Sequence, residues 1–299
     1  MRVTQRSMIT NSLAGLNGNL AAVTRLQQQL TSGKVLTRPS DSPTGTNTAM
    51  QTRSQQALVT QQADNITDAQ SWLNQTDSAL QNMLDVSHRV RDLTVQGLNT
   101  GGISPESAVA IAAEVSSLRD SLLGMANTTV QGRPLFGGVT TGSTAYDATT
   151  GAYTGVLGAG GAPVPVTRRL SDVESIRIDV TGPEAFGNAP DDLFGVVQGI
   201  ATHVTSDPTA LAADLTALDA SINKMLVAIA GVGARSSRVD TAAKLNSDNA
   251  LTLTARLSGI EDVDLARTTM ELQMQQVTYQ AALSVTAKTM QQSLVDFLR

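Results

Sequence analysis

The chain has 299 residues, a formal net charge of −5 and no cysteine. The negative charge argues against nucleic acid as a partner of the whole chain. The lack of cysteine excludes disulfides, thiolate metal sites and cysteine nucleophiles. The sequence contains no uninterrupted run of eighteen apolar residues, so no transmembrane helix is predicted. Hydrophobic residues make up 41% but aromatic residues only 3%, which is typical of narrow helical packing rather than of a large compact core.

The first helix is predicted over residues 1–32. Apolar side chains recur there at steps of three and four residues, which places them on one helical face. These residues are Ile9, Leu13, Leu16, Leu20, Val23 and Leu30, with Leu26 beside them and Gln27 as the one break in the pattern. The helix is predicted to end at Gly33, and a polar connector with Pro39 and Pro43 separates it from the next helix.

Two further helices are predicted before residue 137. The second runs from about residue 45 to residue 99 and carries the only tryptophan, Trp72, which we interpret as a packing anchor. The third opens at Ser104, a favourable N-cap, followed by Pro105 and by Glu106 in the first turn.

The composition changes over residues 137–190, which are rich in glycine, threonine and proline. Two strands are predicted, over residues 162–168 and 174–180. The second alternates apolar and polar residues, as a half-buried strand does. The segment is therefore predicted to be a small β-rich insertion exposed on the surface.

Helices return after the insertion, first over residues 191–204 and then from Asp207-Pro208. Gly231 and Gly233 are predicted to interrupt the second of these helices, and Gly259 to mark a joint before the last one. The last helix carries an apolar stripe that includes Met270, Met274, Val277 and Ala281. Such a stripe needs a partner helix, and the N-terminal helix is the predicted partner.

The predicted fold class is mainly α: a long antiparallel helical rod, resembling a coiled coil, is formed by the N- and C-terminal parts, with the β-rich insertion in the middle. The predicted parts are an N-terminal assembly helix (1–40, pairing with 255–299), the first part of the rod (41–136), the insertion (137–190), the return part of the rod (191–254) and a C-terminal assembly helix (255–299).

Charge is distributed unevenly between the two ends of the chain. Residues 1–60 carry six lysines and arginines but only one carboxylate, Asp41, whereas Glu261, Asp262 and Asp264 lie close together before the last helix. The two ends are therefore predicted to attract each other, with less than ~1 kcal/mol from each exposed pair. We interpret the acidic cluster itself as a solvated helix face.

No pattern in the sequence predicts catalysis or a cofactor. The two histidines, His88 and His203, lie in different predicted helices, and metal sites usually gather several ligands at defined spacing. Neither a phosphate-binding loop nor a nucleophile elbow occurs. We expect no enzyme, no bound metal and no cofactor.

Several stretches resemble the bacterial flagellin superfamily, and within it the hook–filament junction proteins known as hook-associated protein 3. The similar stretches are MRVT (1–4), LTSGKVL (30–36), PSDSP (39–43), GRPLFGG (132–138), EDVDL (261–265) and SLVDFL (293–298). Ser42 stands where the family has a second aspartate. The resemblance covers roughly residues 1–138 and 205–299, and the insertion between them matches nothing.

The resemblance implies a structural component of the extracellular flagellum, exported unfolded through the flagellar type III apparatus without a cleaved signal peptide. It implies a homo-oligomeric ring within a tube. The implied partners are a hook-associated protein on the hook side, flagellin on the filament side and an export chaperone at the C-terminal helix. Neither nucleic acid nor a membrane is an expected partner.

The terminal stripes are the predicted subunit-interaction seam. We expect Leu13, Leu16, Leu20 and Val23 to act against Met270, Met274, Val277 and Ala281. Two other functions remain open at this point. One is flagellin itself, the filament subunit, and the other is a cytoplasmic coiled-coil adaptor that binds partner helices.

Overall fold

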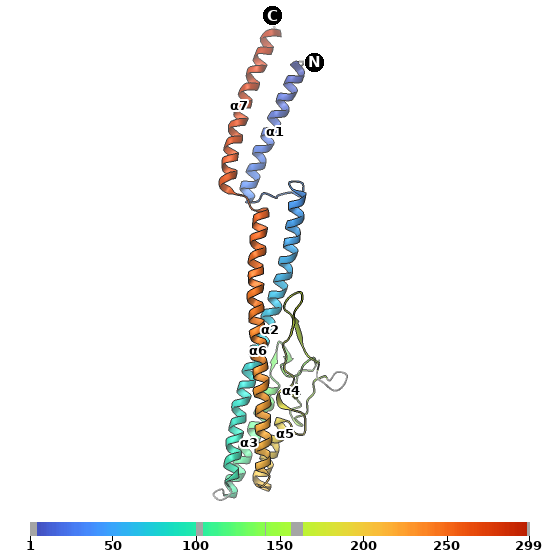
Figure 1. Ribbon diagram of the computed structural model, residues 1–299, viewed down its shortest axis with the longest axis vertical. Coiled ribbons are helices and arrows are strands. Elements are labelled where there is room, and N and C mark those ends of the chain that lie inside the picture. The colour runs from blue at the N-terminus through green and yellow to red at the C-terminus, as the bar shows by residue number, and fades with distance from the viewer. Residues whose placement is uncertain (1–4, 100–103, 141, 157–163, 298–299) are drawn as a thin grey trace. The chain divides into compact units, whose positions relative to one another are not determined.

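The computed structural model describes residues 5–99, 104–140, 142–156 and 164–297, and over these residues the chain is mainly α-helical, as predicted (Figure 1). The elements in chain order are α1 (Gln5–Ser32), α2 (Pro43–Leu98), α3 (Pro105–Ala126), β1 (Thr129–Val130), β2 (Arg133–Pro134), β3 (Thr167–Arg169), β4 (Ser175–Arg177), α4 (Gly182–Phe186), α5 (Leu193–Ser206), α6 (Leu211–Glu261) and α7 (Leu265–Phe297).

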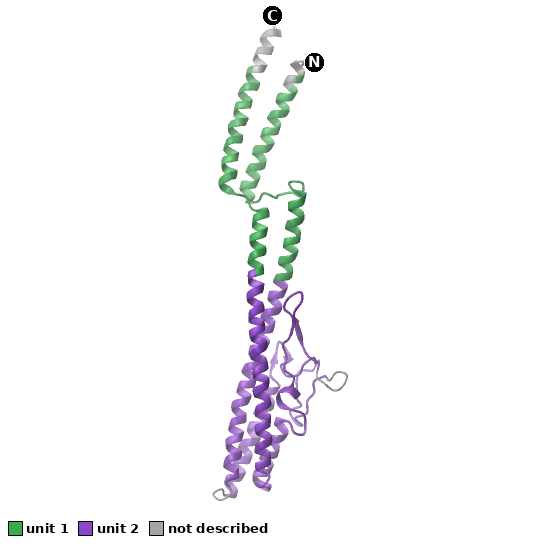
Figure 2. Cartoon of the chain, in the orientation of Figure 1, with its two compact units in different colours: residues 1–59, 249–299 green, residues 60–248 purple. Residues whose placement is uncertain are grey.

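The chain divides into two compact units (Figure 2). The smaller unit combines both ends of the chain, residues 1–59 and 249–299, and the larger unit comprises residues 60–248. Since the dividing points fall inside α2 and α6, each of these helices contributes to both units.

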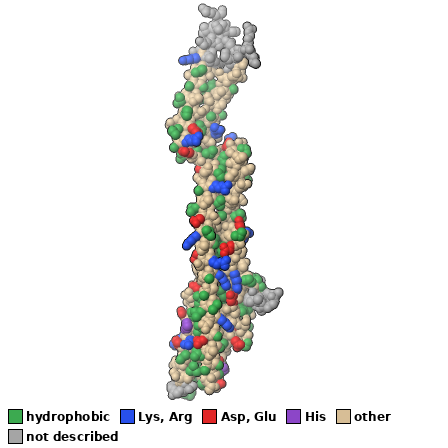
Figure 3. All heavy atoms as spheres, in the orientation of Figure 1, with side chains coloured by type: hydrophobic (Ala, Val, Ile, Leu, Met, Phe, Trp, Pro, Cys, Tyr) green, Lys and Arg blue, Asp and Glu red, His purple; other side chains and the backbone are tan. Residues whose placement is uncertain are grey.

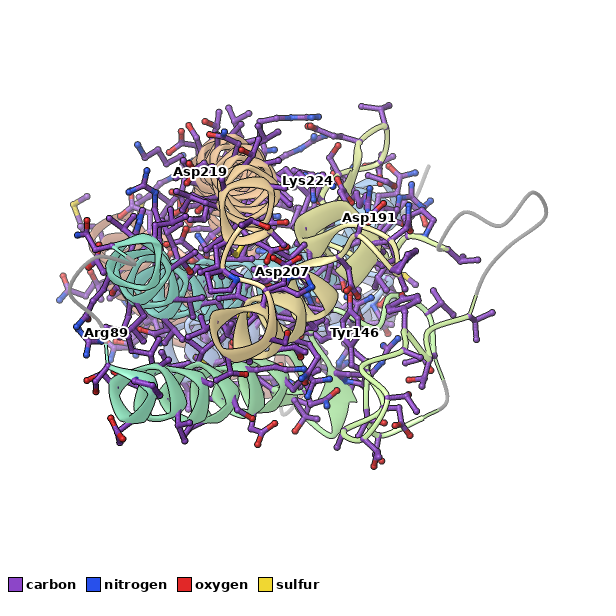
Figure 4. The ribbon with its side chains drawn as sticks, turned by 90° about the horizontal axis from the view of Figure 1, so that it is seen from below. Arg89, Tyr146, Asp191, Asp207, Asp219 and Lys224 are labelled. Atoms are coloured by element: carbon purple, nitrogen blue, oxygen red, sulfur yellow. The ribbon has the colours of Figure 1, made fainter. Side chains whose placement is uncertain are left out.

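In the larger unit, α2 and α6 run antiparallel. Arg91 binds Asp219 at 2.7 Å, and Gln70 donates to Asp240 at 2.8 Å. A step of 21 residues back along α2 (91 to 70) therefore matches a step of 21 residues forward along α6 (219 to 240), so the helices keep one register between these pairs. Figure 4 shows the helices end on, with Arg89 and Asp219 on different sides of the bundle.

The core of the larger unit lies between these helices and α3 and α5. Its fully buried side chains include Leu73, Leu80, Met83, Leu122, Leu218 and Met225. Trp72 is only 4% exposed and belongs to the same core, so its prediction as a packing anchor is confirmed. Helix α3 begins as its sequence predicts, with the Ser104 side chain accepting from the Ser107 amide at 3.3 Å.

The predicted break at Gly231 and Gly233 is wrong, because α6 runs without interruption through both. A glycine inside a helix costs about 1 kcal/mol relative to alanine. Val232 and Val239 are buried against the core, and full burial of a valine contributes roughly 1.5–3 kcal/mol. Packing therefore outweighs the local propensity. The joint predicted at Gly259 lies just beyond it, after Glu261.

Helix α6 is also long and apolar enough, by length and composition alone, to cross a membrane. A core helix passes the same test, and one face of α6 is buried at Leu211, Leu218, Met225 and Val232 in the core of the larger unit. Its sequence contains no uninterrupted apolar run of eighteen residues, because polar residues interrupt it.

The insertion contains less strand than predicted. Strands β3 and β4 pair antiparallel, with Thr167 opposite Arg177, and Tyr146 forms an isolated bridge with Tyr153. Both strands are three residues long, and the start of the first predicted strand lies outside the described residues. Much of the remaining described segment consists of turns and irregular chain.

Aromatic side chains organise the insertion from within. Phe136, Tyr146, Tyr153, Phe186 and Phe194 form one cluster, with edge-to-face ring contacts at centroid distances between 4.8 and 6.1 Å. Edge-to-face geometry is the favoured one for aromatic pairs. Five of the seven phenylalanines and tyrosines in the chain thus gather in one place, and a compact core forms despite the low aromatic content.

Arginines attach the insertion to the long helices of the larger unit. Arg168 of β3 binds Asp68 of α2 at 2.7 Å, and Arg238 of α6 binds Glu174 at 2.7 Å. Arg235 of α6 also donates to the backbone carbonyl of Asp179 at 2.6 Å. The insertion is therefore held from two helices that are far apart in sequence.

Candidate assembly surface

The smaller unit is built on the antiparallel pair of α1 and α7, which lie side by side (Figure 1). The side chain of Gln275 on α7 donates to Asn19 on α1 at 3.2 Å. On α1, Val23 and Leu26 are buried, at 8% and 9% exposure. The buried face of α1 therefore includes only part of the predicted stripe.

Helix α7 buries a different face from the predicted one. Its least exposed side chains recur at steps of four and three residues, the coiled-coil spacing. They are Thr268, Leu272, Gln275, Tyr279 and Ala282.

The predicted stripe on α7 begins at Met270, two residues further along than Thr268. Two residues correspond to about 200° around a helix, so this stripe points away from the buried face. Met270, Met274 and Val277 are 65%, 66% and 65% exposed, and Ala281 is exposed as well.

The eight predicted seam residues therefore do not meet within one chain as two facing stripes. On α1, Val23 is buried, Leu16 is half-buried, and Leu13 and Leu20 are 49% and 46% exposed. On α7, the buried face is the more polar one and the exposed face is the more apolar one. A helix normally does the reverse, so the outer face of α7 is left without the cover that its composition requires.

The described part of the smaller unit has few buried hydrophobic side chains. Twelve of the twenty large hydrophobic side chains that are exposed in the described residues belong to it, although it is the smaller unit. Its buried hydrophobic residues, among those described, are Val23, Leu26 and Ala49. Figure 3 shows hydrophobic side chains on the surface of α1 and α7. Exposed apolar surface of this extent marks an interaction site.

A short joint connects the α1–α7 pair to the start of α2 and the end of α6, which also belong to this unit. The amide of Val35 donates to the carbonyl of Glu261 at 2.7 Å, and the amide of Val263 donates to the carbonyl of Gly33 at 3.0 Å. Lys34 and Asp262 form a bridge between these bonds. Gly33 has a φ of 70°, a left-handed conformation that glycine adopts without strain at the end of a helix.

Glu261 is the charged centre of this joint. It is 3% exposed, and its carboxylate binds Lys34 Nζ at 2.7 Å and an Arg53 guanidinium nitrogen at 2.7 Å. These bonds, from Lys34 first and then from Arg53, lower the pKa of Glu261 despite its burial. The predicted attraction between the ends of the chain is thus confirmed at one residue. The interpretation of Glu261 as part of a solvated face is wrong, because Lys34 of the connector and Arg53 of α2 both bind its buried carboxylate.

A pH dependence follows for this joint. Because folding lowers the pKa of Glu261 below its usual value of 4.5, its contribution to stability is complete above about pH 4.5 and is lost as the pH falls through the folded value. We expect hydrogen-exchange protection of the Val35 and Val263 amides to decrease below that pH. Glu261→Gln is expected to lower the protection at neutral pH by about 1 kcal/mol and to remove its acid dependence.

The matched control for this prediction is Asp262→Asn, at an exposed neighbouring carboxylate. It is expected to leave both the protection and its pH dependence unchanged. An acid dependence that survives in Glu261→Gln would contradict the assignment to Glu261.

The two histidines do not meet. His88 is exposed on α2, and His203 at the end of α5 contacts Asp214 at 2.6 Å. Within the described part of the chain, no group of three or more His, Asp or Glu side chains is placed to hold a metal ion.

Comparison with known proteins identifies both ends of the chain. Residues 3–141 match the bacterial flagellin N-terminal helical region, and residues 215–298 match the bacterial flagellin C-terminal helical region. Together these matches cover more than two thirds of the sequence.

Whole-length relatives agree with this result. Flagellar hook-associated protein 3 of Salmonella typhimurium is 27% identical over 307 residues, covering 94% of this chain and 95% of that protein. Flagellin of Bacillus subtilis is 26% identical over 300 residues, covering 98% and 97%. The crystal structure of Bacillus cereus FlgL shares the fold, with a TM-score of 0.60, 22% identity and coverage of 70% of this chain and 99% of that one. The chain belongs to the bacterial flagellin superfamily.

Proposed function

We propose that this chain is a structural component of the bacterial flagellum that forms the junction between hook and filament. The main support is the exposure pattern of the smaller unit. Its more apolar α7 face points outward, and few hydrophobic side chains among its described residues are buried. The similarity to hook-associated protein 3 over nearly the full length of both chains supports the junction role.

The physical basis of assembly is the balance between ordering and burial. Ordering the backbone costs roughly 1–2 kcal/mol for each residue. Full burial of a methionine or valine side chain contributes roughly 1.5–3 kcal/mol. The stripe of Met270, Met274 and Val277 contributes little of this in one chain, because each side chain is about two thirds exposed. Neighbouring subunits supply the missing cover, so the terminal pair becomes fully ordered in the assembled tube.

The proposed partners follow from this role. Further copies of the chain form a ring, a hook-associated protein lies on the hook side and flagellin lies on the filament side. An export chaperone binds the C-terminal helix α7 before export and keeps its apolar face covered. The chain acts outside the cell, as part of the flagellum.

Deletion of the gene tests this function. We expect cells with hooks but without filaments, and unpolymerised flagellin in the medium. Hooks with no flagellin anywhere would identify the chain as the filament subunit. The similarity to Bacillus subtilis flagellin is the reason to test this alternative. Ordinary filaments would contradict both functions and would favour a cytoplasmic adaptor.

A further inference from the structure

An open groove lies between the C-terminal half of α1 and the connector that follows it. It has a volume of about 410 Å³. Leu20 and Arg25 line it from α1, and Thr37, Arg38 and Asp41 line it from the connector. Leu20 is 46% exposed, so the groove combines an apolar patch with two arginines.

The charge of the groove is positive. Among the described residues, the side chains of Arg25 and Arg38 have no carboxylate within 4 Å, whereas Lys34 and Arg53 nearby are paired with Glu261. The one carboxylate in the lining, Asp41, accepts from the Thr37 hydroxyl and from the amides of Thr37 and Arg38. These bonds, led by the Arg38 amide, lower the pKa of Asp41, so it stays ionised and shapes the connector.

A complementary surface lies on the other side of the same joint. Asp262 and Asp264 are exposed between α6 and α7, and Leu265 next to them is 58% exposed. Asp264 accepts from the Arg267 amide as a cap for α7, and Arg267 is paired with Glu271 at 2.9 Å. The surface is therefore acidic with an apolar residue beside it. Its charge is opposite to that of the groove, which also has an exposed leucine.

The joint sets these two surfaces at the same level of the smaller unit. The backbone bridge between Lys34 and Asp262 joins the connector, which lines the groove, to the acidic turn. No residue of the acidic turn lines the groove of its own chain. Two complementary surfaces at one level, which do not bind each other within a chain, are suited to a head-to-tail contact between copies, and such a contact forms a ring where its rotation closes.

We propose that the groove around Leu20, Arg25 and Arg38 binds the turn Asp262–Leu265 of a second copy of this chain. The arginines neutralise the two aspartates, and Leu265 covers Leu20. This contact rests on the proposed function, since it names the surfaces through which neighbouring copies meet side by side in the ring. It is separate from the outer stripe of α7, which then stays available for other neighbours.

Single-cysteine cross-linking tests this contact, and the natural absence of cysteine makes the assay clean. Two full-length chains with different tags, one with Arg25→Cys and one with Asp262→Cys, are expressed together. Flagella isolated from these cells are then treated with a short bismaleimide. We expect a cross-linked product that contains both tags, which cannot form within one chain. The control pair is Arg25→Cys with Val173→Cys, at a 98% exposed site on the insertion, and it is expected to give none.

Charge reversal provides the second readout. Arg25→Glu and Asp262→Lys are each expected to reduce the number of attached filaments, and the double variant is expected to restore it. Absence of the mixed product together with no rescue would overturn the contact. If deletion of the gene removes filaments while these variants have no effect, the contact fails and the junction function stands. If deletion leaves filaments in place, the proposed function itself fails.

Discussion

Replacement of Met274 and Val277 by aspartate is expected to abolish incorporation of the chain into the flagellum while the larger unit stays folded. Both side chains are about two thirds exposed on α7, so the isolated chain loses little burial. In the assembled tube a neighbouring subunit would cover each aspartate and leave its charge unpaired. Burial of an unpaired charge costs several kcal/mol, enough to prevent assembly.

The measurement compares the variant in the sheared flagellar fraction with the variant in the medium. Met274→Leu with Val277→Ile keeps the face apolar and is expected to incorporate normally. Val173→Asp introduces the same charge at a fully exposed position of the larger unit and is expected to have no effect. Normal filaments from the aspartate double variant would show that the outer face of α7 is not an interface.

The sequence allowed the type and order of the main helices to be predicted, because apolar residues recur at helical spacing over long stretches. It did not predict which face of α7 is buried within the chain. Thr268, Gln275 and Tyr279 form the inner face and Met270, Met274 and Val277 the outer one. A periodic pattern reports the face with more apolar residues, and in an assembly protein that face can belong to the neighbour.

Two other differences have equally local causes. The glycines at 231 and 233 weaken α6, but side chains packed from other parts of the chain stabilise it. Glu261 was predicted to be solvated because Asp262 and Asp264 follow it in the sequence. In the structure it is buried against Lys34 and Arg53, which lie more than two hundred residues earlier in the chain. The opposite charges of the two chain ends were the available signal for this contact. Their pairing could not be assigned, because sequence spacing gives no distance across such a separation.

Replacement of Phe194 by alanine is expected to lower the free energy of unfolding of the larger unit by about 3–5 kcal/mol. Phe194 is 1% exposed in the first turn of α5, with its ring centroid 4.8 Å from that of Tyr146 and 5.6 Å from that of Phe186. Truncation leaves a cavity in the aromatic cluster, where Tyr146 and Phe186 are themselves fully buried and have little freedom to fill it.

Denaturant unfolding followed by tryptophan fluorescence measures this change, because Trp72 is the only tryptophan and lies in the core of the larger unit. The control is Tyr279→Ala, which truncates a half-buried aromatic side chain on α7 in the smaller unit. It is expected to leave the Trp72 transition unchanged. A shift below about 1 kcal/mol in Phe194→Ala would mean that the aromatic cluster unfolds separately from the helices around Trp72. A full shift would mean that the insertion and the helical core of the larger unit form one cooperative unit, which the arginine contacts to α2 and α6 hold together.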